Sequence, residues 1–370
     1  MAQAFRITAL PGDGIGAEVM EAALAVLEHV GASATVAFEV TTRPIGGAAI
    51  EAHGQPIDEA TLEVCRGADA ILLGAVGGPQ WDRLPTESRP EWALLRLREA
   101  LGLFTNLRPA KVYPALVQAS SLKEEVVADT DLVVVRELTG GIYFGQPRGY
   151  DDQRGWNTLV YTRNEVERIT RVAMELALKR SGRVTSVHKA NVLESSQFWR
   201  DVVHQVAEEY PGVTLDDMYV DNAAMQLVRQ PGQFDVILTQ NMFGDILSDV
   251  AAMITGSLGM LPSASLGDKH ALYEPVHGSA PDIAGQGQAN PLAMIASVAM
   301  MLTISLERPE LGARLEQAIE QTLAAGYRTA DIAASGAQVI GTDEMTRQVL
   351  ASYDRLNAAT ESHREAIKED

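Results

Sequence analysis

Residues 10–19, LPGDGIGAEV, join a short apolar run at 5–10 to a predicted helix at 17–30. The spacing G-x-G-x-x-A, which starts at Gly12, matches the dinucleotide fingerprint, and Glu39 lies near the distance expected for its ribose-binding acid. The match raises the question of whether a nicotinamide cofactor binds at this turn. Motifs elsewhere in the chain answer it.

Runs of β-branched residues alternate with helical patterns along the chain, which predicts an α/β fold. Within 166–177, apolar residues recur at steps of three and four, the period of an amphipathic helix packed on a sheet. The predicted strands lie at 5–10, 35–40, 70–76, 132–137, 184–188, 218–220 and 234–238. Further helices are expected at 92–102, 194–209 and 291–307.

Two segments depart from this alternation. In 140–161, aromatic residues alternate with glycine and polar residues, which predicts a β-rich arm suited to pairing with another subunit. The stretch 255–268, TGSLGMLPSASLGD, is rich in glycine, serine and proline and is the expected hinge. A chain of 370 residues is expected to form two lobes, or one large α/β unit with an insertion.

Composition excludes several classes of protein. The formal net charge of −19 argues against a nucleic-acid partner, because such a protein needs a basic face to displace counterions. The single cysteine, Cys65, excludes an internal disulfide and a thiolate cluster for zinc or iron–sulfur, and the scattered histidines argue against a histidine-based metal site. Without a charged leader or an apolar run of membrane-spanning length, the sequence predicts a soluble cytoplasmic protein.

A pair of carboxylates suggests a metal site. In NMFGDILSD (241–249), Asp245 and Asp249 are four residues apart, so both leave the same face if the segment is helical. Like charges repel there unless a cation lies between them, and Mg²⁺ and Mn²⁺ prefer carboxylate and substrate oxygens. The alternative is a solvated acidic helix face. Asp221, which follows a predicted strand, is a third candidate ligand and favours the metal site.

A second group of candidate residues is cationic. Arg98 lies near the end of a predicted helix, Arg108 lies in an extended piece before a proline, and Arg136 ends an apolar strand. In so acidic a chain, these arginines indicate a pocket for carboxylates, which the planar guanidinium binds with two hydrogen bonds. Tyr143 follows across a pair of glycines, and Lys189 follows another predicted strand. A nearby metal would lower the pKa of such an ammonium group, which suits a general acid or base.

Eight motifs, taken in order, resemble those of the metal-dependent β-decarboxylating dehydrogenases, the isocitrate/isopropylmalate dehydrogenase family. The resemblance runs from about residue 5 to about residue 350. It implies a two-domain fold with a large mixed sheet flanked by helices, not a Rossmann fold. The motifs are LPGDGIGAEV (10–19), LLGAVGGPQWD (72–82), LLRLREALGLFTNLRP (94–109), RELTGGIYFGQPRG (136–149), SVHKANVLESS (186–196), YVDNAAMQLV (219–228), NMFGDILSD (241–249) and EPVHGSAPDIAGQGQANP (274–291).

The resemblance also implies roles for the candidate residues. Arg98, Arg108 and Arg136 would bind the two carboxylates of the substrate. Mg²⁺ or Mn²⁺ would be bound by three aspartates, and Tyr143 and Lys189 would form the acid/base pair. In this family the lysine and one aspartate reach the active site of the other subunit, so a homodimer is expected. The three metal ligands would be Asp221, Asp245 and Asp249.

The cofactor is expected at a different place from the opening turn. In this family it lies against 274–291, and Ile15 alone would lend the opening loop a contact. The fingerprint would then be a false positive, a tight turn in which glycines permit close approach. Asp282 matches the position that binds the ribose 2′-hydroxyl and would repel the 2′-phosphate of NADP, which predicts NAD. The other cofactor-binding residues would be Glu274, His277, Gly278, Ser279, Ala280 and Asn290.

The substrate's variable group is expected to lie against the helix before Arg98. By motif, Glu91, Leu94, Leu95 and Val192 line this pocket. Two leucines and a valine favour an isopropyl group, and Glu91 would repel the third carboxylate of isocitrate or homoisocitrate. The expected reaction is therefore oxidative decarboxylation of 3-isopropylmalate in leucine biosynthesis. The alternative substrates are D-malate and tartrate, which would leave the pocket partly empty.

Two further expectations concern organisation and class. The resemblance divides the chain into a cofactor-binding domain, 1–103 with 256–370, and a domain for dimerisation, metal and substrate, 104–255. The competing class is a non-enzymatic dinucleotide-binding protein or redox sensor. The evidence for that class is the opening glycine turn alone. It would require that the acids and arginines of the eight motifs have no function.

Overall fold

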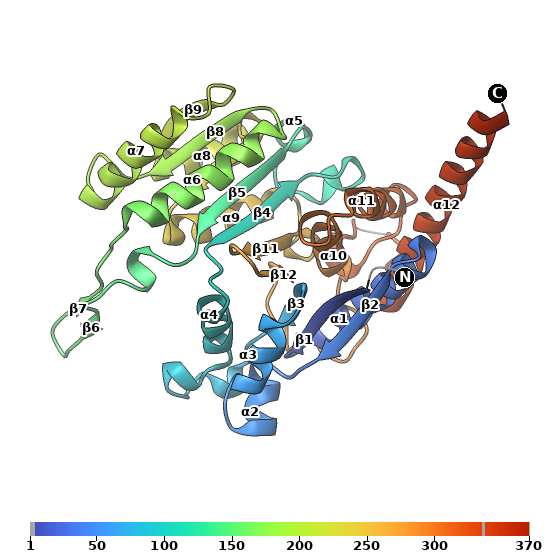
Figure 1. Ribbon diagram of the computed structural model, residues 1–370, viewed down its shortest axis with the longest axis horizontal. Coiled ribbons are helices and arrows are strands. Elements are labelled where there is room, and N and C mark those ends of the chain that lie inside the picture. The colour runs from blue at the N-terminus through green and yellow to red at the C-terminus, as the bar shows by residue number, and fades with distance from the viewer. Residues whose placement is uncertain (1–3, 335–336, 370) are drawn as a thin grey trace.

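A computed structural model describes residues 4–334 and 337–369 of the chain, apart from the side chains beyond residue 359. Its main sheet has ten strands in the order β2-β1-β3-β12-β11-β4-β5-β10-β8-β9 (Figure 1). The strands are β1 (Ala4–Gly12), β2 (Ala37–Thr42), β3 (Ala70–Ala75), β4 (Thr105–Lys111), β5 (Asp131–Glu137), β8 (Arg183–His188), β9 (Thr214–Tyr219), β10 (Val236–Thr239), β11 (Pro262–Leu266) and β12 (Ala271–Pro275).

The sheet is parallel at both ends and antiparallel in the middle. β2, β1, β3 and β12 run parallel, as do β5, β10, β8 and β9, whereas β12, β11, β4 and β5 are antiparallel neighbours. A Rossmann sheet is parallel and reads 3-2-1-4-5-6. The large mixed sheet is therefore the fold that the family resemblance predicts, and the fingerprint match in the opening turn does not indicate a Rossmann fold.

Helices cover both faces of the sheet. They are α1 (Gly16–Ala34), α2 (Gly47–His53), α3 (Glu59–Arg66), α4 (Pro90–Ala100), α5 (Glu124–Val127), α6 (Arg163–Leu178), α7 (Glu194–Ala207), α8 (Val220–Arg229), α9 (Asn241–Ile254), α10 (Leu292–Ile304), α11 (Pro309–Ala324) and α12 (Thr342–Glu369). None of the described helices is both long and apolar enough to cross a membrane.

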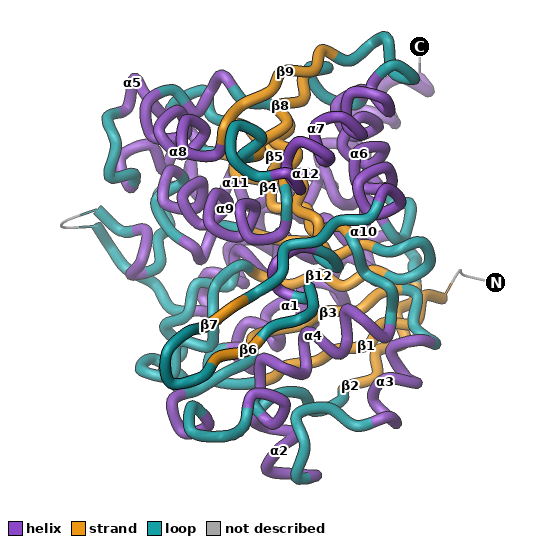
Figure 2. Tube along the Cα trace, turned by 90° about the vertical axis from the view of Figure 1, so that its left-hand side faces the viewer, coloured by secondary structure: helices purple, strands orange, loops and turns teal. Residues whose placement is uncertain are grey.

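The apolar core is continuous on one face of the sheet and split on the other. Alternate strand residues, such as Leu72 in β3 and Val135 in β5, join one cluster with α1, α6, α7 and α10–α12. Their neighbours Leu73 and Val134 belong to two separate clusters, one with α3 and α4 and the other with α8 and α9. Figure 2 shows α8 and α9 in the upper half of the molecule and α2–α4 in the lower half. The gap between these two clusters, over the antiparallel strands, is where a ligand can reach the sheet.

The opening turn is occupied by the chain itself. The N–H of Asp13 donates to Ala75 O, that of Ile15 to Ser279 O and that of Gly16 to Asp13 O. A Cβ on Gly14, which has φ +56°, would lie 2.0 Å from Ser279 O, so glycine is required there by the neighbouring loop. These amides are therefore not free for a pyrophosphate.

Several predicted elements need correction. The strand expected at 35–40 is β2, shifted because α1 continues to Ala34, and the one expected at 218–220 is β9, which ends where α8 begins at Val220. The expected hinge at 255–268 contains β11, which pairs with β12 on one side and with β4 on the other. The expected arm is β-rich only at its tip, where β6 (Gly149–Tyr150) pairs with β7 (Gly155–Trp156) and extends away from the body (Figure 1).

Candidate functional site

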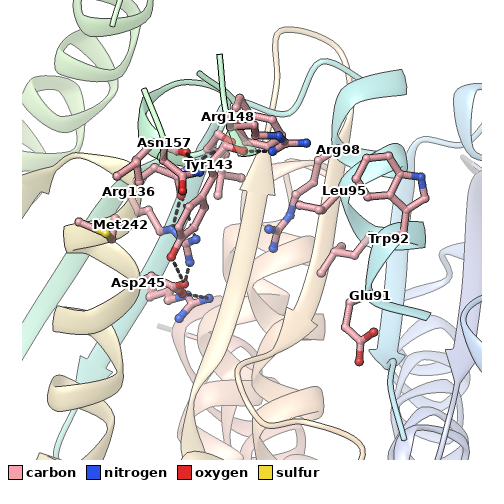
Figure 3. Close-up of a pocket in the computed structure, with 16 residues that line it drawn as sticks. Glu91, Trp92, Leu95, Arg98, Arg136, Tyr143, Arg148, Asn157, Met242 and Asp245 are labelled. Atoms are coloured by element: carbon pink, nitrogen blue, oxygen red, sulfur yellow. Dashed lines mark hydrogen bonds and ion pairs between the residues drawn. The ribbon is translucent and has the colours of Figure 1, made fainter. Parts of the chain in front are cut away.

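The main cavity of the described chain lies in the gap between the two apolar clusters and has a volume of about 730 Å³. Residues of α4 form one wall, and residues of β4, β5, α9 and the 138–157 segment form the other (Figure 3). The lining residues are Glu91, Trp92, Leu94, Leu95, Arg98, Arg108, Arg136, Leu138, Ile142, Tyr143, Phe144, Arg148, Asn157, Asn241, Met242 and Asp245.

The sheet register places two arginines side by side. Asn106 of β4 lies opposite Arg136 of β5, so Arg108, two residues on, projects from the same face. The Nε of Arg108 donates to Asn106 Oδ1 at 2.8 Å, which fixes the plane of its guanidinium. Arg136 is held in the same way, because its Nε and Nη2 both donate to Asn241 Oδ1, at 3.1 and 2.9 Å.

Asp245 is the common acceptor of this wall. Its Oδ1 accepts a hydrogen bond from Arg136 Nη1 and lies 3.8 Å from Arg108 Nη2. Its Oδ2 accepts a hydrogen bond from Tyr143 Oη at 3.0 Å. Figure 3 shows these groups together on one side of the cavity, facing α4. The cluster has an excess of positive charge, because two guanidinium groups share one carboxylate.

Burial and mutual repulsion shift the pKa values of this cluster. Burial, together with the nearby charge of Arg108, lowers the pKa of Arg136 to about 10, although Asp245 acts in the opposite direction. Burial and Arg98 likewise lower the pKa of Arg108. An added dianion would relieve this repulsion between cations. Burial and the Asp245 carboxylate raise the pKa of Tyr143, which keeps its hydroxyl protonated as a proton donor.

The opposite wall of the cavity combines a cation with apolar side chains. Arg98, in the last turn of α4, lies with its Nη2 3.0 Å from Glu274 Oε1, and both side chains are largely buried. Glu91, Leu94 and Leu95 precede it on the same helix and also line the cavity. The structure thus brings together all three predicted substrate arginines and three of the four residues predicted for the substrate's variable group.

Asp249 lies beside Asp245 on α9, as the spacing of four predicts, and its Oδ1 is 3.3 Å from Arg108 Nη1. The side chain of Asp249 is 64% exposed. Within the described part of one chain, no three histidine, cysteine or acidic side chains come together as a metal site. One chain therefore brings together two of the three predicted metal ligands, Asp245 and Asp249.

Lys189 and Asp221 lie together outside the cavity. Lys189 follows β8, Asp221 begins α8, and the Lys189 Nζ is 2.7 Å from Asp221 Oδ1. The hydrogen bond from Lys189 lowers the pKa of Asp221. Val192, predicted to contact the substrate, is 66% exposed close to this pair. A single chain does not bring these three residues to Arg98, Arg108 and Arg136.

The predicted cofactor loop packs against the opening turn. Ser279 O accepts the N–H of Ile15 at 2.8 Å, and Ala280 adopts a positive φ of 37°. His277 Nδ1 is 2.9 Å from Gly278 O. Its Nε2 is buried and has no hydrogen-bond partner among the described residues, and burial lowers the pKa of this imidazole. This nitrogen is therefore free to form a hydrogen bond with a ligand at the loop.

The remaining predicted cofactor residues continue from this loop. Asp282 is exposed, and Gln286 Nε2 donates to its backbone carbonyl at 2.8 Å. Asn290 is buried, with its Nδ2 3.0 Å from Asp331 Oδ2. Glu18 of α1 accepts hydrogen bonds from the N–H groups of Gly285 and Gly287, the latter at 3.0 Å. Glu18, although part of the motif at 10–19, and Asp331 were not predicted as site residues, because the sequence does not show which groups an acid contacts in the fold.

Three comparisons place these features among known proteins. The family model described as isocitrate/isopropylmalate dehydrogenase matches residues 6–349. The 3-isopropylmalate dehydrogenase of Chlorobium chlorochromatii is 61% identical over 94% of this chain and 99% of its own length, and that of Chlorobaculum tepidum is 60% identical over 94% and 99%. A solved structure of isocitrate dehydrogenase from Methylococcus capsulatus superposes with a TM-score of 0.84 at 36% identity, covering 94% of this chain and 99% of that one.

Proposed function

The chain belongs to the isocitrate/isopropylmalate dehydrogenase family and is a decarboxylating dehydrogenase, and from this premise we propose that it acts on 3-isopropylmalate. In the proposed reaction, NAD oxidises the substrate at C2, carbon dioxide is lost, and 4-methyl-2-oxopentanoate is formed, as a step of leucine biosynthesis. The reaction would require Mg²⁺ or Mn²⁺.

One observation carries the choice of substrate. The three arginines and Asp245 form a site for a dianion, and directly beside it the cavity presents Leu94, Leu95 and Glu91. A buried methyl or methylene group is worth about 1–3 kcal/mol in such a pocket. The carboxylate of Glu91 would instead repel the third acid group of isocitrate. D-malate and tartrate, the alternative substrates, would leave the leucines without a partner.

The chain's own residues divide the chemistry between them. Arg98, Arg108 and Arg136 would hold the two carboxylates and orient C2. Lys189 would accept the proton of the C2 hydroxyl as hydride leaves C2. Tyr143, whose raised pKa keeps it protonated, would return a proton to the enolate carbon after carbon dioxide departs.

The residues present fit both missing groups. Asp245 and Asp249 offer adjacent carboxylates, the donors that a hard divalent cation prefers, and Asp221 would be the third ligand. His277, with its unsatisfied Nε2, and the loop to Ala280 would hold NAD, with Glu274 near the nicotinamide, Asn290 near the adenine and the exposed Asp282 at the ribose. When bound, the metal would draw electron density from the substrate oxygen and NAD would accept the hydride.

Two features support a homodimer with shared sites. Lys189, Asp221 and Val192 do not line the cavity of their own chain. The outer faces of α8 and α9 expose apolar side chains, among them Met225, Val228, Ile246 and Met253. Large exposed apolar faces mark interfaces. A second copy that covers these helices would bring its lysine and aspartate to this cavity. A cytoplasmic location stays a prediction of the sequence.

The test is a substrate panel followed by absorbance at the NADH band. Protein, Mg²⁺ and NAD are mixed with 3-isopropylmalate, isocitrate, D-malate or tartrate, and the panel is repeated with NADP. We expect the highest kcat/KM with 3-isopropylmalate and NAD. A higher kcat/KM with D-malate would instead support the alternative, and binding of NAD without any turnover would support a dinucleotide sensor.

A further inference from the structure

A buried histidine directly precedes Lys189. His188 is the last residue of β8 and only 1% exposed. In the parallel pairing of β8 with β9 it lies opposite Tyr219, and Asp217 lies opposite Ser186, so the three side chains His188, Tyr219 and Asp217 share one face. The ring of Tyr219 packs edge-on against the imidazole, with centroids 6.0 Å apart.

Both ring nitrogens of His188 are engaged, and the contacts fix its tautomer. Nδ1 lies 3.2 Å from the backbone nitrogen of Ala190, which can only donate, so Nδ1 must be the unprotonated acceptor. Nε2 lies 3.1 Å from Asp217 Oδ1 and therefore carries the proton that it donates. The imidazole thus links a carboxylate on β9 to the amide that follows Lys189.

Asp217 is itself held from the other side. Its Oδ2 lies 2.6 Å from Nε2 of His204, which comes from α7 and is half exposed. Burial raises the pKa of Asp217, but the contacts with His188 and His204 outweigh it and hold the pKa below its usual value. Asp217 therefore accepts hydrogen bonds from both histidines, and this network joins α7, β9 and the end of β8.

The network acts on the backbone that carries Lys189. The carbonyl of Lys189 accepts the N–H groups of Val192 and Leu193, at 3.1 and 3.0 Å. The amide of Ala190 is held by His188, so the chain is fixed on both sides of the lysine. A lysine ammonium sits on a flexible four-carbon stem, and its precision depends on a fixed backbone. Here that backbone presents Nζ to Asp221 at 2.7 Å.

We propose that His188 is a positioning residue for Lys189: held by Asp217, its imidazole fixes the turn that aims the ammonium group at Asp221 and at the substrate. The inference rests on the proposed function, in which Lys189 takes the proton of the substrate hydroxyl. It concerns kcat, because His188 touches neither substrate nor cofactor.

The test uses the full-length protein with two substitutions. His188→Leu removes both contacts, whereas His188→Asn keeps an acceptor near the position of Nδ1 and loses only the contact with Asp217. For His188→Leu we expect kcat to fall about 10- to 100-fold, with the KM values for 3-isopropylmalate and NAD within about twofold of wild type. His188→Asn should recover part of the loss. The deuterium isotope effect on kcat, measured with substrate deuterated at C2, should rise in His188→Leu as the chemical step becomes slower.

Controls separate the possible failures. His29 makes the same kind of contact, with Nε2 2.6 Å from Asp354 Oδ1, but between α1 and α12, so His29→Gln should keep wild-type kcat and isotope effect. The inference is wrong if His188→Leu keeps wild-type kcat and isotope effect. It is equally wrong if the lost activity follows the unfolded fraction, measured by circular dichroism. If Lys189→Met keeps full turnover, or wild type does not oxidise the substrate, the proposed function fails instead.

Discussion

The side chain of Tyr143 makes two contacts, which have different roles. Its hydroxyl donates to Asp245 Oδ2, and its ring lies 6.0 Å from the guanidinium carbon of Arg136. The ring contact positions the side chain, and the hydroxyl alone carries a transferable proton. The two contributions can be separated, because phenylalanine keeps the ring and loses the proton.

We therefore expect Tyr143→Phe to lower kcat by about 10²- to 10⁴-fold, the usual contribution of a general acid, with little change in KM. Steady-state kinetics with saturating Mg²⁺ and NAD measure both constants. Tyr150→Phe is the matched control, because Tyr150 is 88% exposed at the tip of the arm. Wild-type kcat in Tyr143→Phe would remove the tyrosine from the mechanism.

At the residue scale, the charged residues of the site could be predicted from the sequence. The neutral polar residues that hold them in place could not. Arg98, Arg108, Arg136 and Asp245 could be found because arginines and acids at strand and helix ends stand out in sequence. Asn241, which holds Arg136 and also donates to Leu138 O, could not, because a single amide predicts no partner. Its role is seen only in the structure, where β10 pairs with β5 and Asn241, which begins α9 directly after β10, comes next to Arg136.

At the scale of elements, Asp235 fastens the start of β10 to the turn before β8. Its carboxylate accepts hydrogen bonds from Arg180 Nε at 2.7 Å, from Ser181 Oγ at 2.6 Å and from the N–H of Arg183 at 3.2 Å. Burial raises the pKa of Asp235, but the hydrogen bonds from these donors lower it by a larger amount. The pKa of Asp235 therefore lies below the ordinary value of 3.8. The ionised form therefore stabilises the folded chain.

We expect Asp235→Asn to lower the free energy of unfolding by about 2–3 kcal/mol at pH 7. A lowered pKa gives stability that is present above the ordinary value and lost as pH falls through the lower, folded-state value. The difference between wild type and variant in urea unfolding should therefore shrink below about pH 4. Asp152→Asn, at an exposed position of the arm without such hydrogen bonds to the described residues, should leave stability unchanged. A difference that persists undiminished at pH 2 would contradict the assignment.

Glu18 connects the first turn of α1 to the predicted cofactor loop. Its two carboxylate oxygens accept the N–H groups of Gly285 and Gly287, both of which have positive φ. Glu18→Gln keeps one acceptor and loses the charge, so we expect the KM for NAD to rise about tenfold while kcat stays nearly constant. The exposed Glu21 on the same helix provides the control Glu21→Gln. An unchanged KM for NAD would show that the loop does not depend on this carboxylate.

Among the elements, the strands of the two parallel parts of the sheet, such as β3 and β5, could be predicted from the sequence. The antiparallel strands β4 and β11 between them could not. β3 and β5 are buried on both faces and read as continuous apolar runs. In β4 and β11 the site itself interrupts that pattern, because Asn106 and Arg108 face the cavity side and Asn106 contacts Ser263 and Ser265. Residues 262–266 therefore resembled a hinge, although they form β11.

On the scale of the whole molecule, the split core explains where the site lies. Leu73 and Val134 mark two apolar clusters on one face of the sheet, and the polar side chains of β4, β5 and β11 fill the gap between them. Arg136, Lys189 and Asp221 all follow or end parallel strands at the same edge, the usual place for ligands in α/β sheets. Lys189 and Asp221 nevertheless do not line the cavity of their own chain, so the proposed site would be completed by a second copy.

This geometry makes a prediction about mixed dimers. Asp245→Asn and Lys189→Met should each abolish turnover, because one removes a proposed metal ligand and the other the proposed base. In a mixed dimer, one chain carries Asp245→Asn and the other carries Lys189→Met. If the lysine serves the partner's cavity, one site of this dimer is intact and the other site has both defects. Random mixing gives half mixed dimers with half their sites intact, so activity should return to about a quarter of wild type.

The measurement is NADH formation after the two variants are unfolded together in urea and refolded, with each variant refolded alone as the control. Ile246→Glu, placed on the exposed face of α9, should prevent the recovery and yield monomers in analytical ultracentrifugation. Val40→Glu, on the exposed edge strand β2, should not. If Lys189 served its own cavity, both sites of every mixed dimer would be defective and no activity would return, so the mixture distinguishes the two arrangements without a structure of the dimer.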